Sequence, residues 1–343
     1  MKNKLQFFLL GILVLCILFA YMGCNKDDRT VTGPSSGATT QIDANGTLTP
    51  TTRTQAQGTL IIADQNGNAI TGITSQNISI QLTWGTSSSN SIVGTVAVQS
   101  LAQTGKSTAV AMTMDYSGSM YTGNYVNGKY QQIIDMENGV KAFVNAIKTN
   151  DVCEIIKFDD VVKVIQPFTS SKQALLHAVD SIPILGYGNT ALYQSIYSGI
   201  QDVAGKSASS YARAVIAFTD GGENSSSISL STLLQTARLN AVPVYTIGLF
   251  DASSHSTPPG QYYPEKTLVQ IADSTGGFYY YAPGASQLQQ IYNSISGQLS
   301  NGYIITITWP STSLPTTGTV VTVVITVNYN GLTSVFNRTY TMP

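Results

Sequence analysis

The middle of the chain alternates between short apolar runs and longer stretches in which apolar residues recur at helical spacing. The apolar runs predict strands at 109–114, 153–158, 161–166, 214–219, 242–248 and 277–281. The amphipathic stretches predict helices at 133–147, 172–181, 192–200, 228–239, 265–274 and 285–299. Strands that alternate with helices in this way are typical of an α/β fold with a doubly wound, mostly parallel sheet.

One pair of predicted strands lies too close together for a helical crossover. The segment 153–166 contains two apolar runs separated only by Phe158-Asp159-Asp160. Such a short connection joins antiparallel strands. We therefore expect a hairpin here, with one reversed strand at the edge of an otherwise parallel sheet.

On both sides of this region, apolar and polar residues alternate with the two-residue period that is typical of strands. The predicted strands are 59–63, 78–84 and 92–98 before it, and 303–309, 320–328 and 334–340 after it. The flanks also share a composition, since 65–105 contain no Asp, Glu, Lys or Arg and 301–343 contain only Arg338. We predict one small β-sandwich of about six or seven strands, split by the α/β domain. Two separate β elements are the alternative.

The N-terminus has the pattern of an export signal. Lys2 and Lys4 precede an apolar run from Leu5 to Met22, after which the chain becomes polar at once. A signal peptide at 1–23 is expected, with an uncleaved membrane anchor as the alternative. Residues 24–57 are rich in Ser, Thr, Gly and Asn and predict a flexible tether.

These patterns divide the rest of the chain into three parts. N-terminal β-strands are expected at 58–104, the α/β domain at 105–300 and C-terminal β-strands at 301–343.

Composition narrows the functional classes. Charged residues make up 10% of the chain, with 17 Lys and Arg against 18 Asp and Glu, so no basic surface for nucleic acid is expected. The three cysteines are Cys16, Cys24 and Cys153. They are too few and too far apart for a disulfide framework or a cysteine zinc site, and Cys153 lies in an apolar run as a buried thiol would.

Candidate chemistry lies where predicted strands end. Asp115, Ser117 and Ser119 follow the run 109–114, Thr190 lies in the loop before another helix, and Asp220 ends the run 214–219. Ligands of doubly wound sheets bind at the carboxyl ends of the strands. Oxygen ligands of this kind suit a hard cation such as Mg²⁺. Ser and Asp also cap turns and helices, which explains each motif singly but not their convergence.

The three motifs together resemble the metal-ion-dependent adhesion site of von Willebrand factor A domains, which is also found in integrin I domains. The residues that carry the resemblance are Asp115, Ser117, Ser119, Thr190 and Asp220, in the family's order. The resemblance implies that the three hydroxyls bind the metal, with Thr190 binding directly when a ligand is engaged, and that the two aspartates act mainly through waters. Mg²⁺ is the expected ion, with Mn²⁺ or Ca²⁺ as alternatives.

A second resemblance concerns the N-terminal region. Gly23-Cys24 is similar to the cleavage and lipidation site of bacterial lipoproteins, although Tyr21 stands where that family usually carries Leu. It implies acylation of Cys24. The protein would then be lipid-anchored in the bacterial cell envelope, outside the cytoplasm, in the outer membrane or at the cell surface.

The functional prediction is a metal-dependent protein-binding module for adhesion or complex assembly. The resemblance implies that its Mg²⁺ captures an Asp or Glu side chain of a partner. No catalysis is expected, because no His, Lys or Cys lies near the three motifs in sequence. A structural scaffold of an envelope complex and a metal-dependent hydrolase are the alternatives. Near the site, we expect Tyr116 to shape access to the ion and Glu223 to be a solvated loop charge.

Overall fold

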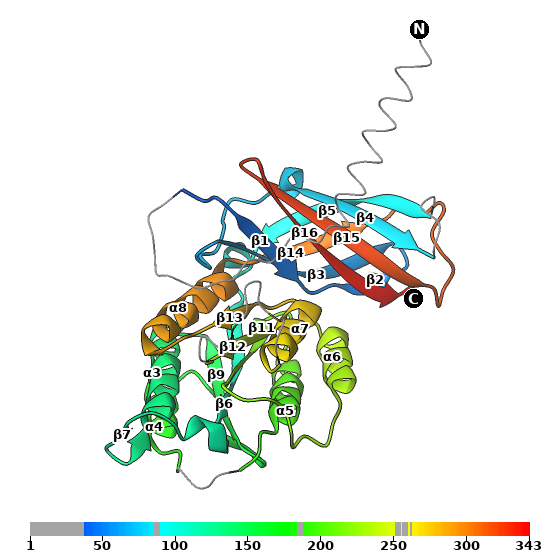
Figure 1. Cartoon of the computed structure of the whole chain (residues 1–343). Helices are drawn as coiled ribbons and strands as arrows, with labels where there is room; N and C mark the ends of the chain where they lie inside the picture. Colours follow the sequence, from blue (N-terminus) through cyan, green and yellow to red (C-terminus); the bar gives the residue numbers. More distant parts are fainter. Residues whose placement is uncertain (1–37, 86–89, 184–187, 251–254, 256–259, 261–262) are drawn as a thin grey trace.

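The computed structural model describes residues 38–85, 90–183, 188–250, 255, 260 and 263–343. The predicted signal peptide, Cys24 and the first part of the predicted tether lie outside the described residues. In the part of the chain that is described, no helix is both long and apolar enough to cross a membrane. Figure 1 shows an α/β domain with a β module packed at one end of it.

The α/β domain is built on a six-stranded sheet in the order β10-β9-β6-β11-β12-β13. Its strands are β6 (Ser107–Asp115), β9 (Val152–Phe158), β10 (Val162–Thr169), β11 (Tyr211–Thr219), β12 (Val244–Gly248) and β13 (Tyr279–Tyr281). Neighbouring strands pair in parallel except β10, which pairs antiparallel with β9 at the edge. The predicted mostly parallel sheet with one reversed edge strand is confirmed.

Helices cover both faces of this sheet (Figure 1). They are α3 (Gln131–Ala146), α4 (Lys172–Asp180), α5 (Leu192–Ala204), α6 (Leu230–Leu239), α7 (Glu265–Thr275) and α8 (Ala285–Asn301). One core joins α3, α4 and α8 to one face, and a second core joins α5, α6 and α7 to the other. Successive strand residues point to opposite faces, so Tyr280 lies in the first core and Tyr279 and Tyr281 lie in the second.

The β module is a single antiparallel sheet made from both flanks of the chain. Its strands are β1 (Ile42–Gly46), β2 (Thr49–Thr52), β3 (Gln55–Asp64), β4 (Ile78–Trp84), β5 (Ser91–Ser100), β14 (Tyr303–Thr308), β15 (Val320–Tyr329) and β16 (Leu332–Thr341). β14 pairs with β3 on one side and β5 on the other, so a C-terminal strand completes the N-terminal sheet. The flanks therefore form one module, as predicted.

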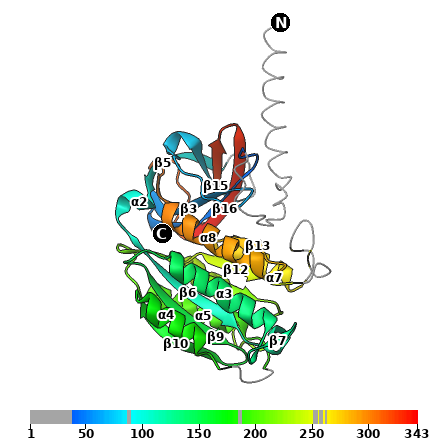
Figure 2. The same cartoon turned by 90° about the vertical axis from the view of Figure 1, so that its left-hand side faces the viewer.

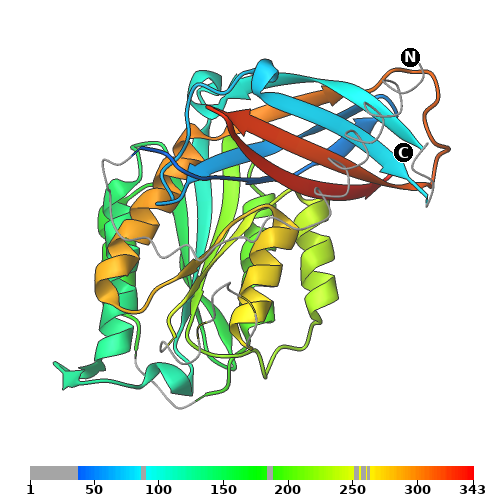
Figure 3. The same ribbon diagram turned by 45° about the horizontal axis from the view of Figure 1, so that its top comes forward.

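The sandwich prediction is only partly right. β5 pairs with β4 through Ser91–Gly94 and with β14 through Thr95–Ser100, so one strand connects two halves that would otherwise be separate sheets. The sheet curls until β1 meets β16, where the Ala44 backbone N–H donates to Ser334 Oγ at 2.9 Å. Figure 3 shows the resulting nearly closed roll of strands. Its inside is filled by a separate apolar core.

The predicted tether at 24–57 is wrong from Ile42 onward. β1, β2 and the start of β3 all lie inside that range. Ile42 and Ala44 are buried, while the polar residues between and after them pair through the sheet backbone. A five-residue strand with two apolar side chains has too little sequence signal to distinguish it from a linker, because its stability comes from β3 and β16.

Polar contacts fix the β module to the α/β domain. Asn45 Nδ2 donates to the Gly277 carbonyl oxygen at 2.6 Å, and Gln298 Nε2 of α8 donates to the Gly67 carbonyl oxygen at 2.7 Å. Gly276 has φ 97° and comes so close to Gly46 that a Cβ there would lie 2.3 Å from the Gly46 oxygen. Figure 2 shows α8 alongside α3 with the β module above them. The carboxyl ends of β6 and β11 face away from the β module (Figure 1).

A carboxyl pair between β9 and α5 makes the stability depend on pH. Burial and, to a lesser extent, the neighbouring Asp202 together raise the pKa of Glu154 from 4.5 to about 7. Because the folded pKa lies above the ordinary value, the contribution of neutral Glu154 to stability is complete at low pH and is lost as pH rises through about 7. We expect Glu154→Gln to raise the free energy of unfolding by about 2 kcal/mol at pH 8 and to leave it unchanged near pH 4. Denaturant unfolding of variant and parent at both pH values measures this, and an equal gain at both would contradict it.

Candidate metal centre

Three loops meet at the carboxyl ends of the parallel strands β6 and β11. Phe218 pairs with Met114, so the residues that follow, Thr219 and Asp115, leave the sheet side by side. The Gly118 backbone N–H donates to the Gly188 carbonyl oxygen at 2.9 Å, which connects the loop after β6 to the loop before α5. The structure therefore brings the three predicted motifs together.

The third loop is joined to the second through Asn224. The Thr190 backbone N–H donates to Asn224 Oδ1 at 2.7 Å, and the Asn224 backbone N–H donates to the Thr190 carbonyl oxygen at 3.1 Å. These reciprocal bonds hold Thr190 beside the loop that carries Asp220. The positions of the site residues are thus fixed by backbone bonds between loops.

Asp115 forms the buried floor of the site. Its side chain is inaccessible to solvent, and Oδ1 accepts from the Ser117 backbone N–H at 2.7 Å. Oδ2 accepts from the Thr219 hydroxyl at 2.5 Å. Thr219 was not among the predicted residues, although its position directly before Asp220 at a strand end is a signal that could have pointed to it.

The hydroxyls and Asp220 form the upper part of the site. Ser119 Oγ donates to Asp220 Oδ1 at 2.7 Å and lies 3.2 Å from Ser117 Oγ. A Cβ on Gly221 would lie 2.9 Å from Ser119 Oγ and 3.5 Å from Thr190 Oγ1, so both hydroxyls border the same glycine. All five predicted residues, Asp115, Ser117, Ser119, Thr190 and Asp220, are brought into one cluster.

Gln132 of α3 is a further residue of the site that the sequence did not predict. Its Nε2 donates to Asp220 Oδ2 at 2.6 Å, and its Oε1 accepts from the Thr122 hydroxyl. Both oxygens of Asp220 are therefore engaged by neutral donors. No local motif marks Gln132, because its role depends on the packing of α3 beside the loop after β11.

Both carboxyl groups titrate at unusually high pH. Burial and, to a lesser extent, the charge of Asp220 together raise the pKa of Asp115 to about 7. Burial also raises the pKa of Asp220, to about 6. The hydrogen bonds from Thr219 and Ser117 oppose the shift at Asp115 but do not cancel it. Among the described residues, the groups bonded to these two carboxylates are hydroxyl, amide and backbone N–H groups, and none is a cationic side chain.

This donor set fits a hard divalent cation. A bound cation would compensate the two negative charges that burial disfavours, and the three hydroxyls supply neutral oxygen ligands. Among the residues described, no cluster contains three or more His, Cys, Asp or Glu side chains. A cation at this site would accordingly depend on Ser117, Ser119 and Thr190 together with the two aspartates.

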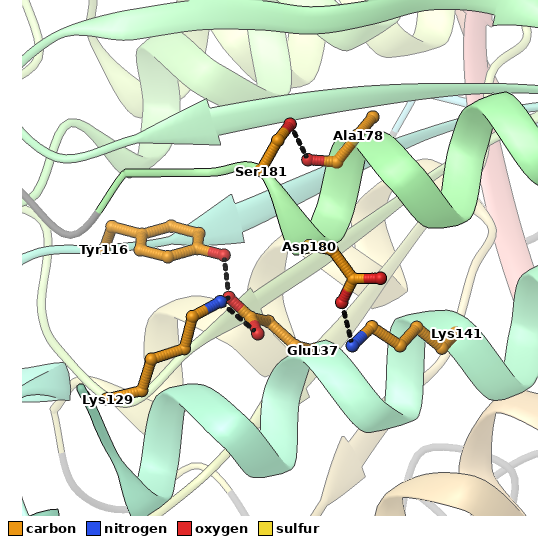
Figure 4. Close-up of polar contacts among 7 residues, drawn as sticks. All are labelled: Tyr116, Lys129, Glu137, Lys141, Ala178, Asp180 and Ser181. Atoms are coloured by element: carbon orange, nitrogen blue, oxygen red, sulfur yellow. Dashed lines mark hydrogen bonds and ion pairs between the residues drawn. The ribbon is translucent and has the colours of Figure 1, made fainter. Parts of the chain in front are cut away.

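The prediction that Tyr116 shapes access to the ion is wrong. Tyr116 is fully buried, and its hydroxyl donates to Glu137 Oε1 at 2.8 Å. Lys129 Nζ lies 2.6 Å and 2.7 Å from the two oxygens of the same carboxylate. Figure 4 shows Tyr116 and Lys129 both directed at Glu137, beside the separate Lys141–Asp180 pair. The loop after β6 is thus anchored from beneath by α3.

Lys129 belongs to a hairpin that the sequence pattern did not predict. β7 (Tyr125–Val126) and β8 (Lys129–Tyr130) pair between the Ser119 loop and α3. Two-stranded hairpins are marginally stable alone, so the bond between Lys129 and Glu137 is part of what holds this one. Tyr130 also packs edge to face against Tyr125 and Tyr121.

Glu223 is a helix cap and not the solvated loop charge that was predicted. Its Oε2 accepts from the Tyr193 backbone N–H at 2.8 Å, at the start of α5, and its Oε1 accepts from the Ser226 backbone N–H at 2.6 Å. A carboxylate at a helix N-terminus accepts hydrogen bonds from otherwise unpaired N–H groups and interacts favourably with the helix dipole. Glu223 therefore fixes the loop after Asp220 to the helix that follows Thr190.

The fold and the residues at its strand ends define an α/β domain with a carboxylate and hydroxyl site. The model of the von Willebrand factor type A domain family matches residues 110–294, which is more than half of the chain. The chain belongs to this family. The comparison with curated proteins gave no match.

Solved structures that resemble the chain are distant in sequence. Conserved hypothetical protein BatB from Bacteroides thetaiotaomicron is 17% identical over 56% of this chain and 98% of its own, with a TM-score of 0.45. A von Willebrand factor type A protein from Catenulispora acidiphila is 11% identical over 90% of this chain and 74% of its own, with a TM-score of 0.47. Proximal thread matrix protein 1 from the mussel byssus, with a zinc-occupied MIDAS motif, is 18% identical over 62% and 49%, with a TM-score of 0.46. Family membership rests on the family model.

The buried bond beneath the metal loop should be measurable by mutation. We expect Tyr116→Phe to lower the free energy of unfolding by about 1–3 kcal/mol, because Glu137 is a buried charge that loses one of its donors. Denaturant unfolding monitored by circular dichroism measures the change. Tyr125→Phe is the matched control, since it removes the same atom from a side chain that is 65% exposed and should change stability by less than about 0.5 kcal/mol. Equal effects of the two substitutions would contradict the anchoring role.

Proposed function

We propose that the protein is a metal-dependent protein-binding module that captures an acidic side chain of a partner, in adhesion or in complex assembly. The observation that supports it is the convergence of Asp115, Ser117, Ser119, Thr190 and Asp220 at the ends of β6 and β11. The cluster would act as a metal-ion-dependent adhesion site. Mg²⁺ is the proposed ion, because all the donors are oxygens.

The arrangement of the two aspartates favours capture of a partner carboxylate. Asp115 is occupied by Ser117 and Thr219, and Asp220 is occupied by Ser119 and Gln132. Carboxylates engaged in this way would approach a cation mainly through waters and would leave it incompletely neutralised. Bound Mg²⁺ would keep positive charge, which an Asp or Glu side chain of the partner would neutralise by binding to it.

We propose no catalytic role for this site. The groups bonded to Asp115 and Asp220 are hydroxyl, amide and backbone N–H groups, none of which is a general base at neutral pH, and the two carboxylates themselves would be committed to the cation. A metal-dependent hydrolase would need a base or nucleophile within reach of the metal. A binding function requires only the cation and an open approach to it.

The proposed location is the bacterial cell envelope. We propose that Cys24 is acylated and that the lipid anchors the chain outside the cytoplasm, in the outer membrane or at the cell surface. In the described part, the carboxyl ends of β6 and β11 face away from the β module that the N-terminal segment enters (Figure 1). An anchor at that end would leave the metal site directed away from its attachment point.

Thr190→Ala tests the binding function. We expect partner capture from native envelope extract in Mg²⁺ to fall at least tenfold, because a direct ligand of the cation is lost. The free energy of unfolding should change by less than about 1 kcal/mol. Pull-down followed by quantitative mass spectrometry measures capture, with Thr236→Ala on the far helix α6 as the matched control.

A chelator separates the alternatives in the same experiment. A binding module loses its partner in chelator while its circular dichroism spectrum is unchanged, whereas a metal-stapled scaffold loses its fold. Capture that is the same for Thr190→Ala and the parent, or the same with and without chelator, would contradict the adhesion mechanism.

A further inference from the structure

A groove opens directly beside the metal site. Its volume is about 490 Å³, and it lies between the loop after β6, the start of α3 and the segment that leads into α8. Its lining includes Ser119, Gln131, Gln132, Asp135 and Asp220. Ser119 and Asp220 belong to both the groove and the metal cluster. One ligand can therefore contact the cation and enter the groove.

The described lining of the groove is negatively charged. Among the described residues, Asp135 and Asp220 are the charged side chains that line it. Two lysines on or next to α3 are already paired, Lys129 with Glu137 and Lys141 with Asp180. Because Asp220 belongs to the metal cluster, Asp135 is the charged lining residue of the groove that a bound cation would not engage.

The carboxylate of Asp135 can accept further hydrogen bonds. Its Oδ1 accepts from Gln131 Nε2 at 2.7 Å, and within the described residues no cation pairs with its carboxylate. The neighbouring Gln132 is committed at both ends, to Asp220 and to Thr122. A charged donor entering the groove would therefore meet Asp135 as its free acceptor.

We propose that this groove receives a Lys or Arg side chain of the same partner segment whose acidic residue binds the metal. The inference rests on the proposed function of the metal site and adds a second contact, between the groove and a basic side chain of the same partner. A guanidinium or ammonium group matches the carboxylate of Asp135 in charge, and charge-assisted bonds of this kind are stronger than neutral ones. The cation selects an acid and the groove selects a base, so the surface is complementary to a segment that carries both.

The arrangement also disfavours partners with two acidic residues. A second carboxylate in the groove would face Asp135 with no cation to separate them, and like charges at an interface reduce affinity. The metal alone would bind any accessible Asp or Glu, and the groove would exclude those partner segments that place a second acidic residue beside Asp135.

Synthetic peptides test this directly on the full chain. The probes are blocked glycine-based peptides that carry one Asp with Arg, citrulline or Glu at varied spacing, because citrulline has the shape of Arg without its charge. In Mg²⁺ at low ionic strength we expect the best Asp–Arg peptide to bind about five- to tenfold more tightly than its Asp–citrulline counterpart by fluorescence polarisation. The Asp–Glu peptide should bind more weakly than either.

Two variants assign the preference to the groove. Asp135→Asn should abolish the advantage of Arg over citrulline and leave binding of the Asp–citrulline peptide unchanged, and Asp135→Lys should reverse the order so that the Glu peptide binds best. Asp180→Asn, which removes the same charge from α4, is the matched control and should keep the preference of the parent.

The outcomes separate this inference from the proposed function. Peptides that bind in Mg²⁺, are released by chelator and show no preference for Arg would overturn the groove assignment while leaving metal capture intact. An Arg preference that survives Asp135→Asn would overturn it as well. Asp peptides that bind equally with Mg²⁺ and with chelator, or do not bind at all, would contradict both.

Discussion

The parallel pairing of β6 with β11 is the constraint on which the site depends. It places Asp115 and Thr219 side by side at the same edge of the sheet and brings Asp220 close to the hydroxyls of the other loop. Two carboxylates are thereby held close together in a partly buried place, and burial raises the pKa of each. Such a pair is unfavourable when ionised unless positive charge is supplied. The fold thus creates an electrostatic requirement that a divalent cation would meet.

The loops at this edge are held by bonds that lie outside the cluster. Tyr116 and Lys129 converge on Glu137, and Glu223 caps α5 from the loop after Asp220. Each of these contacts joins a loop of the site to a helix that packs on the sheet. The cluster is therefore pre-organised, which reduces the ordering cost of binding a cation and a partner. Gln132 contributes from the same helix as Glu137 by engaging Asp220 directly.

The β module gives the site its orientation. The strand before the α/β domain, β5, and the strand after it, β14, pair with each other, so the same sheet holds the first and last residues of that domain. Asn45 and Gln298 add contacts across the boundary, and α8 extends from the groove beside the metal site to the strand β14. The cluster faces away from this module as a result (Figure 1). A partner can approach the cluster without contacting the strands of the β module.

The sequence by itself determined the α/β architecture, the reversed edge strand and the five residues of the cluster, since these follow from local periodicity and from motifs at strand ends. It did not reveal β1 or the β7–β8 hairpin, because β1 depends on pairing with β3 and the hairpin on the bond between Lys129 and Glu137. It also misjudged Tyr116 and Glu223 and missed Gln132, because their roles depend on groups distant in the chain. Whether the flanks formed a sandwich or a curled sheet was likewise decided by β5, which pairs on both of its halves. Local pattern encodes which elements form, whereas burial and pairing between remote segments decide which polar groups meet.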